Sequence, residues 1–197
     1  ENADKKHVIL VPTSNIMTRT LNTIMKKYNV LGLTTSKRRA QQAVEKYGGE
    51  IITKNIYVKA IARNVQYKKE LLYWLYYGSK HGRAINTLAC FDGVVFQDFL
   101  DLSDPLSLGD EQQYEDNCIK KLYQLASRVF RTVDGKHRVR FLLTCNDKAF
   151  ELLRRIVPNW QFHESPSSTV AIELIEGVAE PLPIIPSLKP ITYKLPS

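Results

Sequence analysis

Val8-Ile-Leu-Val-Pro-Thr-Ser-Asn15, near the start of the chain, and Arg140-Phe-Leu-Leu-Thr-Cys-Asn-Asp147, far along it, share one pattern. Each is an apolar run of strand length that ends in small polar residues and leads into an amphipathic helix pattern. Such runs are typical of buried parallel strands, whose carboxyl ends open onto the crevice where α/β proteins place their sites. The sequence therefore predicts an α/β fold with a central, mostly parallel sheet flanked by helices.

The hydrophobic patterns in the rest of the chain predict further strands and helices around this pair. Strands are predicted over residues 7–12, 29–34, 86–91, 94–100, 138–144 and 168–175, with a tight turn at Asp92-Gly93. Helices are predicted over residues 16–28, 37–47, 66–80, 112–130 and 147–156, the first capped by Ser14 or Asn15 and the second by Ser36. Residues 50–62 fit either a strand or a helix that starts near residue 55.

The end of the chain differs in composition from the rest. From residue 177 onward prolines alternate with apolar residues. Because proline fixes φ and removes a backbone donor, we expect an extended arm without regular structure. The chain then divides into an N-terminal overhang (1–6), one domain (7–176) and the arm (177–197). Extended apolar segments dock in grooves or on sheet edges, and the arm residues expected to contact a partner protein are Leu182, Ile184, Ile185, Leu188, Ile191 and Tyr193.

The overall composition fits one soluble globular domain, with 197 residues, 44% of them hydrophobic and 24% charged. No apolar run approaches the roughly 18 residues of a membrane span, and the N-terminus lacks the apolar segment of a signal peptide. We therefore expect an intracellular protein, in the cytoplasm or the nucleus, without membrane contact. Cys90, Cys118 and Cys145 cannot all pair with one another and fit thiols in a reducing compartment.

The net charge of +8 is distributed unevenly along the chain. Residues 1–83 hold 16 Lys/Arg and 5 Asp/Glu, whereas residues 84–119 hold eight acids and no Lys or Arg. A basic half joined to an acidic belt favours nucleic-acid binding, although a solvated helix surface gives the same pattern. The residues expected to contact phosphates are Lys37, Arg38, Arg39, Lys46, Lys54, Lys59, Arg63, Lys68 and Lys69.

Several acids are expected at strand ends or helix starts. Asp147 follows the strand 138–144, and Glu115 and Asp116 open the helix 112–130. Carboxylates that converge in this way hold Mg²⁺ or Mn²⁺ for phosphodiester cleavage. The alternatives are that the helix dipole favours acids at these positions and that Asp147 is an N-cap. The four histidines (His7, His81, His137 and His163) are far apart in sequence, and the pattern pairs none of them with a nucleophile.

Three short motifs resemble those of PIN domains, in particular the PIN domains of nonsense-mediated-decay and telomerase-associated proteins. They are Val11-Pro-Thr-Ser-Asn15, Glu115-Asp-Asn-Cys-Ile119 and Leu142-Leu-Thr-Cys-Asn-Asp-Lys148, and their order and spacing match over about residues 7–165. PIN domains begin with a strand ending in Val-Pro-Asp-Thr-Asn, continue with an Asp-Asp pair that opens a helix, and close with a Leu-Leu-Thr-Asn/Asp-Asp-Arg/Lys strand–helix junction. The resemblance implies a three-layer PIN-like fold and a role in RNA metabolism such as mRNA surveillance.

The chain departs from this family pattern at two places. Thr13 stands where the resemblance places the first Asp, and a hydroxyl does not replace a carboxylate as an anchor for a divalent ion. Three cations, at residues 37–39, stand where active PIN domains carry an acid. What remains is Glu115, Asp116 and Asp147 (or Asn146 at the same junction), with Thr13, Ser14 and Asn15 at the strand end that lost its acid. We therefore expect a degenerate site without a metal or other cofactor.

Three functions fit these observations. The leading hypothesis is a non-catalytic module that binds single-stranded RNA and a protein partner, for which the resemblance suggests an RNA helicase or another decay factor. The second is an active endonuclease for single-stranded RNA that uses Mg²⁺ or Mn²⁺ on Asp147, Asp116 and Glu115, with Ser14 or Asn15 as a rearranged ligand. The third is a scaffold that binds only proteins.

Overall fold

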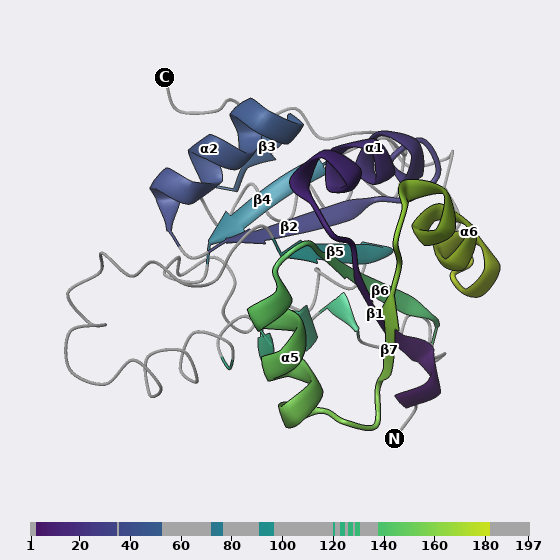
Figure 1. The fold of residues 1–197 in the computed structure, drawn as a ribbon. Helices are drawn as coiled ribbons and strands as arrows, with labels where there is room; N and C mark the ends of the chain where they lie inside the picture. The colour runs from purple at the N-terminus through teal and green to yellow at the C-terminus, as the bar shows by residue number, and fades with distance from the viewer. Residues whose placement is uncertain are drawn as a thin grey trace, which may run out of the picture.

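A single parallel sheet with helices on both faces organises the chain (Figure 1). The computed structural model describes residues 3–34, 36–52, 72–76, 91–96, 120, 123–124, 126–127, 129–130 and 138–181. Within these residues the sheet has seven strands in the order β3-β4-β2-β5-β6-β1-β7, and every neighbouring pair is parallel. The predicted α/β class is confirmed.

The elements follow one another in a regular alternation along much of the chain. The first half forms η1 (Ala3–Lys5), β1 (Lys6–Leu10), α1 (Ser14–Ile24), β2 (Val30–Thr34), α2 (Lys37–Tyr47) and β3 (Glu50–Ile51). The second half forms β4 (Leu72–Tyr76), β5 (Gly93–Phe96), β6 (Arg140–Thr144), α5 (Asp147–Ile156), β7 (Gln161–Glu164) and α6 (Ser168–Val178). Within the helix predicted over 112–130, the described residues Lys120, Tyr123, Gln124, Ala126, Ser127 and Val129 are helical.

The apolar runs that begin at Val8 and Arg140 lie side by side in the sheet, as β1 and β6. The register of β1 and β6 runs from Lys6 opposite Arg140 to Leu10 opposite Thr144. The ladder continues past the strands, because the Val11 amide donates to the Thr144 carbonyl at 2.9 Å. Both runs therefore end at the same edge of the sheet, as buried parallel neighbours should.

The sheet is covered on both faces, which makes a three-layer molecule (Figure 1). Side chains alternate between the faces along β1: Val8 and Leu10 pack with α5, whereas Ile9 and Val11 pack with α1, α2 and α6. The chain therefore passes from β1 to α1 on one face of the sheet, and from β6 to α5 on the other face. Such a reversal between adjacent strands creates a crevice at their carboxyl ends.

Neutral polar caps begin the four long helices in the described residues. The side chains of Thr13, Ser36, Asn146 and Ser167 accept the N-terminal amides of α1, α2, α5 and α6. The cap of α1 is therefore Thr13 and not Ser14 or Asn15, and the Ser36 cap is confirmed. Gly48 ends α2 with a φ of 86°, a conformation that favours glycine.

Three sequence predictions are wrong. Residues 72–76, expected inside a helix over 66–80, form the strand β4 between β2 and β3. Residues 168–178 form α6 where a strand over 168–175 was expected, and this helix extends two residues into the predicted arm. Asp92-Gly93 is no hairpin turn, because β5 begins at Gly93 and pairs only in parallel, with β2 and β6.

The uncertain stretch 50–62 begins as a strand, since Glu50–Ile51 forms β3. Its residues from 53 onward, the acids Glu115 and Asp116, and the arm beyond residue 181 lie outside the described residues. Among the described helices, none has both the length and the apolar character to cross a membrane.

Candidate acidic pocket at the carboxyl edge of the sheet

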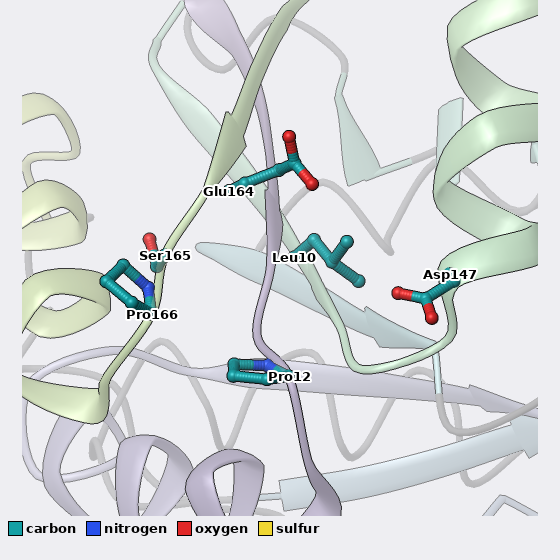
Figure 2. Close-up of a pocket in the computed structure, with 6 residues that line it drawn as sticks. All are labelled: Leu10, Pro12, Asp147, Glu164, Ser165 and Pro166. Carbon is teal, nitrogen blue, oxygen red and sulfur yellow. The ribbon is translucent and has the colours of Figure 1, made fainter.

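A pocket of about 370 Å³ lies where β1, β6 and β7 end (Figure 2). Its lining residues are Leu10, Pro12, Asp147, Glu164, Ser165 and Pro166. They come from the end of β1, the start of α5 and the end of β7. This is the crevice made by the opposite departures of β1 and β6, which is the usual position of a ligand site in an open α/β sheet.

Asp147 contributes a carboxylate to this pocket from the first turn of α5. The cap of that helix is the preceding residue, because Asn146 Oδ1 accepts the Ala149 amide at 2.9 Å. The Asn146 amide in turn donates to Thr144 Oγ1 at 3.0 Å, and that hydroxyl donates to the Phe96 carbonyl at 3.2 Å. The capping alternative for Asp147 is thus wrong, and its exposed side chain faces the pocket.

Thr13, where the resemblance to PIN domains places the first acid, caps a helix. Its Oγ1 accepts the Ile16 amide at 3.2 Å as the N-cap of α1. Ser14 and Asn15 are the first two residues of that helix, and the Ser14 carbonyl accepts the Thr18 hydroxyl at 2.9 Å. The end of β1 therefore carries hydroxyl and amide groups but no carboxylate.

Glu164 supplies a second carboxylate to the pocket, which the sequence pattern did not predict. It ends β7, and the next amide, that of Ser165, donates to the Leu10 carbonyl at 2.8 Å and fastens this corner to β1. In Figure 2 the carboxylates of Glu164 and Asp147 stand on either side of Leu10. The available signal was the short Gln161-Phe-His-Glu164 alternation directly before a Ser-Pro-Ser-Ser helix start.

The described lining of the pocket offers few side chains that could bind a metal ion or act as a nucleophile. Among the described residues, no group of three or more His, Cys, Asp or Glu side chains could hold a metal ion. Cys145, two residues before Asp147, is half-buried, and burial raises the pKa of its thiol, as does Asp147, while Lys46 opposes the shift. The thiol is therefore protonated at neutral pH and is a poor nucleophile.

Part of the predicted basic surface lies at the same edge as the pocket. Lys37, Arg38 and Arg39 form the first turn of α2, which starts at the carboxyl end of β2; the first two are exposed and the third is half-buried. Lys46 is exposed in the last turn. The other predicted contacts, Lys54, Lys59, Arg63, Lys68 and Lys69, lie outside the described residues, as do the partner-binding residues of the arm.

Cations in the first turn of a helix oppose its dipole, at a typical cost of about 0.3–1 kcal/mol each. The first turn of α2 holds three of them and no acid. The helix dipole of α2 therefore does not favour cations at these positions.

The sequence matches no protein-family model, and a search of curated proteins finds no significant match. The chemistry of this edge is accordingly argued from its geometry and charge.

Proposed function

We propose that this chain is a non-catalytic, PIN-like module of RNA metabolism that binds single-stranded RNA across the carboxyl edge of its sheet. The observation that carries the proposal is the charge of that edge. Four described helices begin there with neutral caps, and their first turns hold one acid, Asp147, and three cations in α2. Glu164, at the end of β7, adds a second carboxylate to the edge. Helix N-termini and cations together form a surface for phosphate groups.

The groups that line the described pocket support the non-catalytic part of this proposal. Mg²⁺ requires near-octahedral oxygen ligands and dehydrates reluctantly, so a site needs concentrated negative charge. The described pocket has two carboxylates, Asp147 and Glu164, and a capping hydroxyl where the resemblance places the first acid. Within the described part of the chain, these groups alone are fewer than the two-ion arrangement of phosphodiester cleavage uses.

The test measures the affinity of a labelled single-stranded RNA over a range of salt concentrations. The variant Lys37→Gln/Arg38→Gln removes two exposed cations from the edge. The affinity falls as salt rises, and each lost phosphate contact makes the slope of log K against log salt shallower by about 0.7. We therefore expect the slope of the double variant to be shallower by about 1.4, and its affinity to be weaker at every salt concentration. Removing these cations relieves their unfavourable interaction with the helix dipole.

The matched control is Lys26→Gln/Lys27→Gln. These two exposed cations lie between α1 and β2, at the opposite edge of the sheet, and the substitution removes the same charge. RNA affinity should then change little. Equal effects of the two double variants would mean that net charge alone attracts RNA, and no effect of either would favour the scaffold that binds only proteins.

The resemblance to decay-factor PIN domains further suggests a protein partner, such as an RNA helicase or another decay factor. Binding of that kind belongs to the same proposal, and the apolar arm from residue 182 onward is the segment assigned to it. Truncation after Pro181 should remove partner capture and leave RNA affinity unchanged.

An active endonuclease is the second candidate, favoured by the free Asp147 carboxylate in a pocket at the crevice of the sheet. Calorimetric titration of Mn²⁺, paired with a cleavage assay, separates the two candidates. Binding in the micromolar range and cleavage, both lost in Asp147→Asn, would establish the nuclease. An absence of heat at millimolar Mn²⁺ would establish the dead site.

A further inference from the structure

Two histidines that are far apart in sequence meet on one face of the sheet. His7 lies in β1, and His163 lies in β7, the neighbouring edge strand. In the parallel register His7 is opposite Gln161 and Ile9 is opposite His163, so both imidazoles project to the face covered by α1 and α6. The separation of 156 residues explains why sequence pattern did not pair them.

The two rings face each other edge to edge. His7 Nδ1 and His163 Nε2 are 2.9 Å apart, the rings are inclined by 9°, and their centroids are 5.2 Å apart. With centroids that far apart, so short an N–N distance requires the two nitrogens to point at one another. The contact is therefore a nearly linear hydrogen bond in a common plane.

The neighbours of this pair determine where its protons reside. His7 Nε2 is 3.1 Å from the backbone carbonyl of Asp4, which can only accept, so this nitrogen carries a hydrogen. A neutral imidazole has one N–H, so His7 Nδ1 must accept and His163 Nε2 must donate to it. A chain of two hydrogen bonds thus runs from β7 through β1 to η1.

The pair can take up one proton without breaking this chain, but not two. The first proton can bind His163 Nδ1, which takes part in neither of the two hydrogen bonds, while His163 Nε2 continues to donate to His7 Nδ1. The second must bind His7 Nδ1 and then places two N–H groups and two positive charges against each other. Such coupled groups titrate as a pair.

Among the residues that the structure describes, few charged groups surround the pair. Burial lowers the pKa of both imidazoles; the neighbouring His163 lowers that of His7 further, whereas Asp4 of η1 raises it. The glutamates of α6 (Glu173 and Glu176) and Arg19 of α1 are solvent exposed. From β1 itself, Lys6 projects to the other face, where its Nζ lies 5.4 Å from the Trp160 ring centroid.

We propose that His7 and His163 form a proton-operated latch that holds the edge strand β7 and the turn η1 against β1 and opens when both imidazoles are protonated. Besides the pair, β7 is held by four register pairs with β1 and by the bond from the Ser165 amide to Leu10. Its Phe162 also packs edge-on against Phe150 of α5 and contacts the Arg154 guanidinium. The turn η1 packs against β7, so both depend on the pair (Figure 1). Opening would displace Glu164 and Ser165, which line the acidic pocket, and would couple acidification to that site.

The first test is nitrogen-15 NMR of the histidine rings as a function of pH in the wild-type chain. At neutral pH both residues should carry hydrogen on Nε2, and two coupled protonation steps should follow below the ordinary imidazole range. Hydrogen exchange supplies the structural readout. The protection of the Ser165 amide, corrected for the pH dependence of intrinsic exchange, should fall roughly tenfold for each unit by which the second protonation lies below the unfolded pKa.

An internal control is the Val11 amide, which bonds β6 and does not depend on the latch. Its protection should fall less than that of Ser165. The variant His163→Gln retains a donor near the Nε2 position but cannot be protonated, so the Ser165 protection should depend less steeply on pH, because only His7 can still take up a proton. Independent titration of the two rings, or an unchanged pH dependence in His163→Gln, would overturn the proposal.

Discussion

Replacing Gly32 by alanine tests the packing at the centre of the sheet. Gly32 lies in β2 opposite Trp74 of β4, and the indole lies directly over it: a β-carbon at residue 32 would stand 2.2 Å from the Trp74 ring. Trp74 cannot withdraw easily, because it is fully buried, stacks on Tyr47 and donates from Nε1 to the Gly48 carbonyl at 2.9 Å. The extra methyl group must therefore displace a fixed side chain.

The cost can be worked out from these contacts. Overpacking of a buried site costs about 1–3 kcal/mol, and loss of the indole hydrogen bond adds about 1 kcal/mol. We expect Gly32→Ala to lower the free energy of unfolding by roughly 3 kcal/mol, a large part of the about 5–15 kcal/mol that stabilises a domain. With a urea slope of about 2 kcal/mol per molar, the unfolding midpoint should fall by about 1.5 M.

The matched control is Gly177→Ala. Gly177 lies in α6, and a β-carbon there would meet no atom within 4 Å. Because alanine is the better helix former, this variant should be more stable than the wild type by about 0.5–1 kcal/mol. A midpoint for Gly32→Ala within experimental error of the wild type would refute the packing argument, as would strict additivity with Trp74→Phe.

Three further predictions concern the carboxyl edge and the histidine pair. Asn146→Ala removes the cap of α5 and should cost about 1 kcal/mol in thermal unfolding, whereas Asn146→Asp should cost little. Burial lowers the pKa of His7 and His163 in the folded chain, so below pH 6.5 the unfolded chain binds more protons. The free energy of unfolding should therefore fall as the pH drops below 6.5, and less so in His163→Gln, when measured by urea unfolding across that range. Thr13→Asp introduces a carboxylate where the resemblance to PIN domains places an acid, and it retains a capping oxygen. Calorimetry should then detect tighter Mn²⁺ binding at an unchanged urea midpoint; heats equal to those of the wild type would contradict this placement of the lost acid.

The sequence was sufficient for the strands that are buried on both faces and end in polar residues. The runs at residues 8–11 and 140–144 have no alternation, which is typical of central parallel strands, and polar caps mark the helices that follow. Because strand ends predict the edge of the sheet, the sequence alone was enough to place Asp147 there. It was not enough to place Glu164, because the pairing of β7 with β1 depends on the order of strands in the sheet, which sequence patterns do not determine.

The wrong assignments have separate physical causes. Leu72, Leu75 and Tyr76 are spaced as on a helix, and in a strand buried on both faces the two-residue period disappears, so periodicity could not decide. In α6 the β-branched residues Thr169, Val170 and Ile172 favour a strand. Packing decided otherwise: Ala171 and Ile175, four residues apart, bury one helical face against the core that contains α1.

The neutral caps bear on function as well as on folding. Aspartate caps a helix as well as threonine, serine or asparagine does, so stability does not demand that Thr13, Ser36, Asn146 and Ser167 be uncharged. An acid at any of them would also interact favourably with the helix dipole. The edge instead combines neutral caps with cations in the first turn of α2, an arrangement that lowers stability and raises the local positive potential. The neutral caps and first-turn cations thus support the proposed binding of a polyanion, whereas a nuclease that gathers divalent cations requires concentrated negative charge.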